Sequence, residues 1–138
     1  MALILVAEDN PADVFLIREA LRENGVECAL HVSPDGKDVL DIITGQAAGL
    51  GELKLIILDL NLPRHDGLEI LERLQETGYK HIPVVVLTTS DFVRDRQRAI
   101  ELGAARFLRK PSELESFLRL GAVFKEFLGK SNAACSSA

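Results

Sequence analysis

The residues that point most clearly to chemistry are three acids that follow two apolar runs. Asp59 comes directly after the run Leu55–Leu58, and Glu8 and Asp9 follow the run Ala2–Ala7. Both runs are apolar without polar alternation, which is typical of strands covered on both faces in parallel sheets. Because ligands bind outside the carboxyl ends of the strands in such sheets, we expect the three carboxylates to lie at a binding crevice.

Two further predicted strands also end in polar side chains. The run Ile82–Leu87 ends at Thr88, and the predicted strand Ala105–Leu108 is followed by Arg109 and Lys110. An isolated aspartate after a strand would most simply begin a turn. Reactive groups at several strand ends favour a functional site instead, since all of these side chains would converge on one edge of the sheet.

The residue types predict a metal and an anion. If Glu8, Asp9 and Asp59 lie as close together as expected, their carboxylates would repel one another strongly unless a cation lies between them. Ligation by oxygen alone suits Mg²⁺, which usually binds one or two carboxylates together with a phosphate. Lys110 and the Thr88 hydroxyl would then donate to an anion beside the metal, most economically a phosphoryl group.

The pattern of apolar residues predicts five repeats of strand then helix. Helical spacing follows each strand, and Gly, Pro, Asn or Asp separates the elements. By the right-handed crossover rule, this order gives an α/β fold with a five-stranded parallel sheet and helices on both faces. The predicted elements are strand Ala2–Ala7, a helix from Pro11 to Asn24, strand Cys28–Val32, a helix from Gly36 through Ile43, strand Leu55–Leu58, a helix from Gly67 through Thr77, strand Ile82–Leu87, a helix from Val93 to Leu102, strand Ala105–Leu108, and a last helix opened by Ser112 with an apolar stripe from Phe117 to Phe127.

Composition limits the function classes. A chain of 138 residues, 47% apolar and 27% charged, predicts one soluble globular domain over residues 1–129, with a disordered tail over 130–138. A net charge of −5 without a basic run argues against nucleic-acid binding. The apolar segment Met1–Ala7 is too short for a signal peptide or membrane span, so a cytoplasmic protein is expected. Cys28 and Cys135 are expected to be free thiols.

The remaining candidate residues have structural explanations. Three aspartates are expected to cap helices, and three isolated histidines lack the spacing of metal ligands. The segment Thr44–Glu52, rich in Gly and Ala, is expected to be a flexible connection. The aspartates are Asp35, Asp66 and Asp91, and the histidines are His31, His65 and His81.

These motifs together resemble the receiver domain of bacterial two-component response regulators, over essentially the whole folded length. The resemblance rests on Glu8-Asp9, on Asp59 followed by Pro63 and Gly67, on Thr88, and on Lys110-Pro111. It implies the flavodoxin-like, doubly wound strand order 2-1-3-4-5. The segments Leu-Asp-Leu-Asn-Leu-Pro and Val-Val-Val-Leu-Thr-Thr-Ser resemble the small stand-alone regulators that are paired with phytochrome-type kinases.

The resemblance also implies a role for each matched residue. Asp59 would accept a phosphoryl group from a phosphohistidine on a sensor histidine kinase or a phosphotransfer protein. Glu8, Asp9, Asp59 and the backbone carbonyl of Asn61 would hold Mg²⁺, and Lys110 would neutralise charge on the transferring group. Glu8 replaces the commoner Asp, so it is expected to reach the metal through water.

A switch is implied for two residues further along the chain. Thr88 would hydrogen-bond a phosphoryl oxygen, and its movement would let Phe107 change position, although Phe107 could also be a simple core residue. Phe107 replaces the commoner Tyr and therefore lacks one hydrogen bond. A single-domain regulator must act through its own surface on a downstream protein, and we expect a homodimer through the fourth helix, fifth strand and fifth helix, strengthened by phosphorylation.

One alternative function shares most of this site. A magnesium-dependent phosphatase or phosphotransferase would form the same aspartyl-phosphate intermediate. Such an enzyme would ordinarily carry a second acid two residues after the nucleophile for general acid–base catalysis, and this chain has Asn61 there. The sequence therefore favours a signalling switch, not an enzyme, which would catalyse only its own phosphorylation and dephosphorylation.

Overall fold

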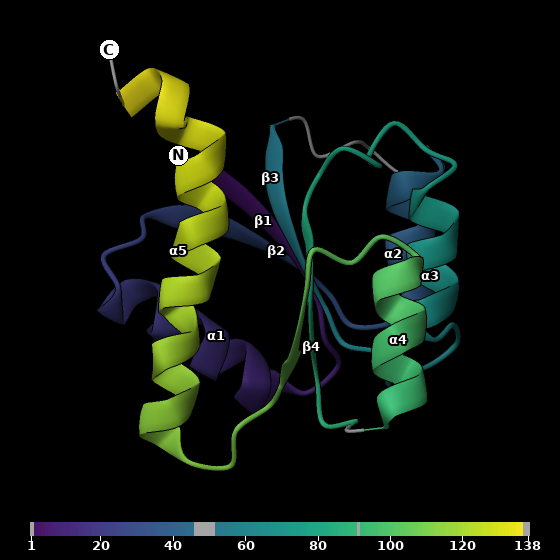
Figure 1. Cartoon of the computed structure of the whole chain (residues 1–138), viewed down its shortest axis with the longest axis horizontal. Helices are drawn as coiled ribbons and strands as arrows, with labels where there is room; N and C mark the ends of the chain where they lie inside the picture. The colour runs from purple at the N-terminus through teal and green to yellow at the C-terminus, as the bar shows by residue number, and fades with distance from the viewer. Residues whose placement is uncertain (1, 46–51, 91, 137–138) are drawn as a thin grey trace.

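A five-stranded parallel sheet with β3 as its middle strand lies between two layers of helices (Figure 1). The computed structural model describes the backbone of residues 2–45, 52–90 and 92–136 and the side chains of these residues as far as Leu128. The strand order is β2-β1-β3-β4-β5, which confirms the predicted flavodoxin-like arrangement. The strands are β1 (Ala2–Ala7), β2 (Cys28–Ser33), β3 (Leu53–Leu58), β4 (Val84–Thr88) and β5 (Arg106–Arg109).

Five helices cover the two faces of this sheet. Figure 1 shows α1 and α5 on one side and α2, α3 and α4 on the other. The helices are α1 (Pro11–Glu23), α2 (Gly36–Ile43), α3 (Gly67–Leu74), α4 (Val93–Glu101) and α5 (Leu114–Ser136). None of the helices in the described part of the chain is long and apolar enough to cross a membrane.

The continuous apolar runs become strands because both faces of the sheet are buried. In β1, Ile4 and Val6 pack with the residues of α1 and α5, whereas Leu5 and Ala7 pack with those of α2 and α3. The same alternation holds in β4, where Val85 faces α1 and α5. Successive side chains of a strand point to opposite faces, so a strand buried on both sides has apolar residues at successive positions.

Side-chain caps begin the helices at the predicted positions. Asp35 accepts a hydrogen bond from the amide of Asp38 at 2.8 Å, and Asp66 accepts one from the amide of Glu69 at 2.9 Å. Both caps confirm the predictions and satisfy amides that have no partner within the helix. The third predicted cap, Asp91, lies outside the described residues, as do residues 46–51 of the predicted flexible connection.

Two helix ends differ from the sequence-based expectation. α3 ends at Leu74 and not at Thr77, because the Thr77 amide and hydroxyl both bond the Leu74 carbonyl, at 3.2 and 3.0 Å, and close a tight turn. α5 continues to Ser136, although a disordered tail is predicted from residue 130. The domain boundary at residue 129 stays a prediction.

The apolar stripe of α5 lies in the core. Phe117, Phe124 and Phe127 are buried with β1, β3 and β4 residues. α1 packs closely against α5 at Gly121, where a Cβ atom would collide with the Ala20 carbonyl oxygen. The stripe therefore holds the helix to the sheet and leaves little apolar area of α5 for a partner.

Candidate functional site

Acidic and basic side chains from three strand ends meet at the carboxyl edge of the sheet. Glu8 and Asp9 follow β1, Asp59 follows β3, and Lys110 follows β5. The side chains of Glu8, Asp59 and Lys110 are only 3%, 5% and 8% exposed, whereas Asp9 is exposed. The structure thus brings together the four charged residues that the sequence analysis selected.

Backbone contacts hold Asp59 in place. Its amide donates to the Ala7 carbonyl at 3.0 Å, and its Oδ1 accepts the Asn61 amide at 3.0 Å. The β3–α3 loop returns so closely that a Cβ atom on Gly67 would lie 2.8 Å from the Asp59 carbonyl oxygen. Only glycine fits there, which explains the Gly67 of the sequence motif.

Lys110 is surrounded by carboxylates. Its Nζ lies 2.7 Å from Glu8 Oε2, 2.9 Å from Asp59 Oδ2 and 2.8 Å from Asp13 Oδ2. Asp13, in the first turn of α1, was missed by the sequence analysis. Its position in the first turn of the helix that follows Glu8 and Asp9 could have indicated that it lies near the site. Acids are common in first turns, however, because they complement the helix dipole, so this position alone does not distinguish Asp13.

These contacts shift the ionisation of the site. Burial raises the pKa of Glu8 to about 7, with Asp59 adding to the rise and Lys110 opposing it. Burial also acts to raise the pKa of Asp59, but the Asn61 amide and Lys110 outweigh it and lower that pKa below its usual value. Burial acts to lower the pKa of Lys110, yet hydrogen bonds to Asp13, Glu8 and Asp59 raise it. Asp59 is therefore ionised, and Lys110 is charged.

Three of the acids could hold a metal ion. Ligand oxygens of Glu8, Asp9 and Asp59 all lie within 4.8 Å of one another, and this is the only such group among the described residues. Oxygens on opposite sides of Mg²⁺ would be about 4.2 Å apart at the usual ligand distance, so these acids fit a hard divalent cation after small movements or through a bridging water. The residues present therefore suit a hard divalent cation.

Thr88 lies beside this cluster, held by neighbouring donors. Its buried hydroxyl oxygen accepts from the Asn61 side-chain amide and from the Ser90 backbone amide, both at 3.3 Å. The same Asn61 amide reaches the Thr89 hydroxyl at 3.5 Å. Ser90 in turn donates its hydroxyl to Asp95 of α4 at 2.7 Å.

Phe107 lies on the same face of the sheet as Thr88. It pairs with Val86 of β4, and Thr88, two residues later, pairs with Arg109. Side chains two residues apart share a face of a strand, so Phe107 and Thr88 lie on the same face as α4. Phe107 is partly buried there against the core of that face.

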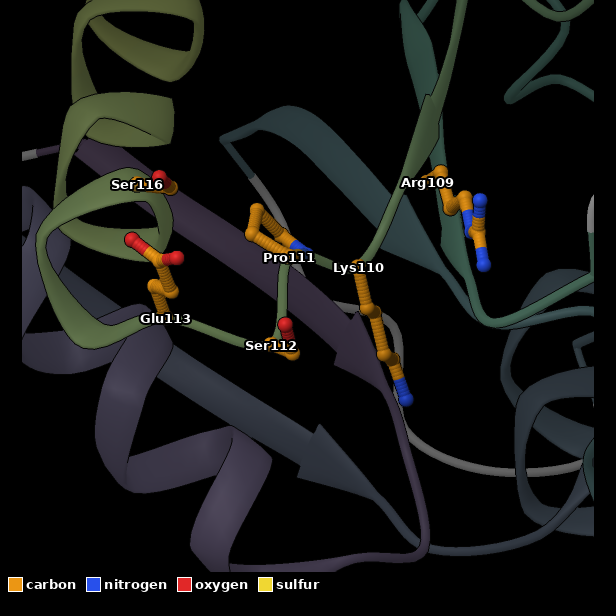
Figure 2. A pocket seen from close by; sticks show the side chains of 6 residues that line it. All are labelled: Arg109, Lys110, Pro111, Ser112, Glu113 and Ser116. Carbon is orange, nitrogen blue, oxygen red and sulfur yellow. The ribbon is translucent and has the colours of Figure 1, made fainter.

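A pocket of about 470 Å³ opens next to Lys110. Figure 2 shows the Lys110 side chain extending away from Glu113 and Ser116. Glu113 directly precedes α5, and Ser116 lies in its first turn. The lining residues are Arg109, Lys110, Pro111, Ser112, Glu113 and Ser116. The β5–α5 connection therefore leaves space for another molecule beside the charged cluster.

Other residues with potential for chemistry stand apart from the cluster. His65 pairs with Glu69 at 2.9 Å, and His31 lies 3.9 Å from Asp38. His81 lies near Pro83 at the opposite end of β4, in the loop that precedes the strand. Cys28 is a free thiol whose pKa is raised by burial.

Comparison with known proteins identifies the family. The family model described as "Response regulator receiver domain" matches residues 4–120. The response regulator MprA of Mycolicibacterium vanbaalenii is 33% identical over 98% of this chain, and the probable methanogenesis regulatory protein FilR2 of Methanothrix harundinacea is 35% identical over 91% of this chain and 82% of its own length. The chain spans 55% of the length of MprA and 58% of that of the transcriptional regulatory protein PcoR of Escherichia coli.

Solved structures agree with this result. The phosphorylated cyanobacterial phytochrome response regulator RcpA is 32% identical, with a TM-score of 0.83 over 91% of this chain and 92% of that one. The Mn²⁺-bound form of the response regulator Rcp1 is 30% identical, with a TM-score of 0.81 over 93% of this chain and 94% of that one. The chain belongs to the response regulator receiver domain family of two-component systems.

Proposed function

We propose that this chain accepts a phosphoryl group on Asp59 from a histidine kinase or phosphotransfer protein and thereby switches a protein-binding surface. The observation that carries the proposal is the buried, ionised Asp59, 2.9 Å from the Lys110 ammonium and beside the Glu8 and Asp9 carboxylates. A nucleophile, a counter-charge and a metal-capable group are thus in one place. Membership of the receiver family supports this assignment.

The transfer uses the ionised form of Asp59. A carboxylate oxygen attacks phosphorus, the new O–P bond forms as the P–N bond to the donor histidine breaks, and the electron pair of that bond remains on the imidazole nitrogen. Lys110 compensates charge on the phosphoryl oxygens, the main contribution a protein makes to this chemistry. A bound Mg²⁺, held by Glu8, Asp9, Asp59 and the Asn61 carbonyl, would add the second positive charge.

The response proceeds through Thr88. Its hydroxyl oxygen accepts from the Asn61 and Ser90 amides, so its own O–H can donate to the phosphoryl group, and a shift of Thr88 toward that group would let Phe107 on the same face change position. The phosphoryl group biases two existing arrangements and does not create a new fold. Asn61 offers an amide where an enzyme would need an acid, which favours this switch over phosphatase turnover.

The partners follow from the chemistry and the relatives. A phosphohistidine donor implies a sensor kinase, and the similarity to RcpA makes a phytochrome-type kinase our specific proposal. A cytoplasmic location belongs to this proposal, because the donor kinase domain would act there. We propose a downstream protein, and not nucleic acid, as the target of the switched surface.

The test is covalent labelling. The protein is incubated with acetyl phosphate and MgCl₂, and its intact mass is measured over time. A stable adduct of one phosphoryl group on Asp59 supports the switch. Steady release of phosphate from ordinary phosphate esters would instead support the enzyme.

Removal of divalent metal is expected to destabilise the protein. Without a cation, Glu8, Asp13 and Asp59 share the Lys110 ammonium, the Asp9 carboxylate lies close to Glu8 and Asp59, and repulsion among these acids remains. A ligand that binds only the folded state at 100 times its Kd adds about 2.7 kcal/mol. The melting temperature should therefore rise by several degrees on titration with MgCl₂ and fall back with chelator; an equal rise in Asp9→Asn would contradict the assignment.

A homodimer through the α4–β5–α5 face remains part of the proposal, on a smaller surface than the sequence suggested. The Phe117, Phe124 and Phe127 stripe of α5 is buried, and the exposed apolar residues that remain on α4, on α5 and just before α4 are Phe92, Val93, Ile100 and Leu114, at 69%, 68%, 48% and 59% exposed. Sedimentation at several concentrations, with and without beryllofluoride as a phosphoryl mimic, should show a dimer that strengthens with the mimic. A monomer in both states would exclude the dimer.

A further inference from the structure

Asp13 gives the charged cluster a contact that the proposed phosphoryl transfer does not use. Its Oδ2 lies 2.8 Å from Lys110 Nζ, although the two residues are 97 positions apart in the chain. Asp13 belongs to the first turn of α1, and its side chain is 19% exposed. The contact therefore ties α1 to the end of β5.

The Lys110 ammonium lies against three carboxylates in this arrangement. A lysine side chain has three N–H donors, and Glu8, Asp13 and Asp59 lie at 2.7, 2.8 and 2.9 Å. An incoming phosphoryl oxygen therefore competes with these carboxylates for Lys110 and gains the ammonium as one carboxylate releases it. The identity of that carboxylate affects how readily the site accepts the group.

Asp13 is the carboxylate that can leave most easily. Glu8 is also fixed by the Asn10 amide at 3.1 Å, and Asp59 by the Asn61 amide at 3.0 Å. The described residues offer Asp13 no such second hydrogen bond, and it is the most exposed of the three. Water can therefore solvate its released carboxylate at the smallest cost.

We propose that Asp13 is a positioning residue that holds Lys110 toward α1 in the unphosphorylated state and competes with the phosphoryl group for its ammonium. Asp13 then slows the transfer of a phosphoryl group to Asp59 and weakens the interaction of Lys110 with the bound phosphoryl group. The inference rests on the proposed phosphorylation of Asp59. It assigns Asp13 a kinetic role that neither the metal site nor the Thr88 switch requires.

The experiment compares Asp13→Asn with wild type in the full chain. Initial rates of phosphorylation by acetyl phosphate are measured by intact mass, and beryllofluoride affinity is measured by NMR titration, which requires no bond to phosphorus. Asp13→Ser serves as a second variant if Asn impairs folding. Glu19→Gln is the matched control, because it removes one negative charge from the same helix at a residue whose nearest ion pair is Arg22 at 3.9 Å.

Asp13→Asn is expected to accelerate phosphorylation and tighten beryllofluoride binding by about fivefold. The reason is that the charge-assisted hydrogen bond from Lys110 to Asp13 no longer competes with the bond from Lys110 to the incoming group. The gain should persist at about 0.5 M salt, where long-range attraction of anions is screened but a buried contact is not. Glu19→Gln should behave as wild type.

An unchanged or slower rate, or a gain that disappears at high salt, would overturn the inference. If wild type is labelled on Asp59 and Asp13→Asn is not faster, only the role of Asp13 fails. If wild type is not labelled on Asp59, the proposed function fails and the role of Asp13 fails with it.

Discussion

Asp59→Asn is expected to abolish labelling by acetyl phosphate completely while the fold remains intact. Asn has the shape of Asp and can still accept the Asn61 amide, but it is not a nucleophile. Intact mass after incubation with acetyl phosphate and MgCl₂ measures the loss. Asp35→Asn is the matched control, because it makes the same change at the α2 cap, and it should be labelled as wild type.

Stability provides a second readout for the same variant. Without metal, the melting temperature of Asp59→Asn is not expected to fall, because Lys110 keeps Glu8 and Asp13 as partners. Glu8 also ionises more easily once the Asp59 charge that raises its pKa is gone. Retained labelling, or a clearly lower melting temperature, would contradict the assignment of Asp59.

Lys110→Met is expected to cost more stability than any other single change at the site, about 3 to 5 kcal/mol at neutral pH. Methionine fills a similar volume but leaves the buried carboxylates of Glu8 and Asp59 without a counter-charge. Urea unfolding measures the loss. Lys37→Met is the control: its pair with Asp41 is exposed, so it should cost about 1 kcal/mol or less.

The cost of Lys110→Met should depend on pH in a definite direction. Without the ammonium, the folded-state pKa values of Glu8 and Asp59 rise above those of the unfolded chain. Raised carboxyl pKa values destabilise the folded state at neutral pH, and this penalty shrinks as the pH falls toward 5 and the groups become protonated. A cost that is independent of pH, or no larger than that of Lys37→Met, would show that the cluster is not held by Lys110.

Much of this site could be predicted because its residues follow strands that are recognisable from sequence. The runs before Glu8, Asp59 and Thr88 are apolar without interruption, and parallel strands place their carboxyl ends along one edge. Asp13 lies on a helix, and its contact with Lys110 depends on how α1 packs against α5 and the sheet. Such crossing geometry is set by side-chain packing, which no local pattern encodes.

The surface was harder to predict than the core for a similar reason. A wide apolar stripe on α5 has the same sequence whether it packs on a sheet or on another protein, and only the fold shows that Phe117 and Phe124 are buried. In α4, Val93 and Ile100 have helical spacing yet remain exposed, and Ala99 alone of that helix is buried. Helical periodicity finds a helix but does not tell which of its faces meets the core.

The position of β1 between β2 and β3 has a consequence for the order in which the sheet can be assembled during synthesis. β1 emerges first, but Ala2 pairs with Cys28 and Leu3 pairs with Leu53, so its second neighbour follows about 2 to 10 seconds later at ordinary rates of translation. During that interval, one edge of an apolar strand has no partner. β5, with only four residues, is the last strand of the sheet to be synthesised, and Lys110 directly follows it. Until Lys110 has emerged, Glu8, Asp13 and Asp59 have no ammonium between them, so the charged cluster cannot form before the last strand has been made.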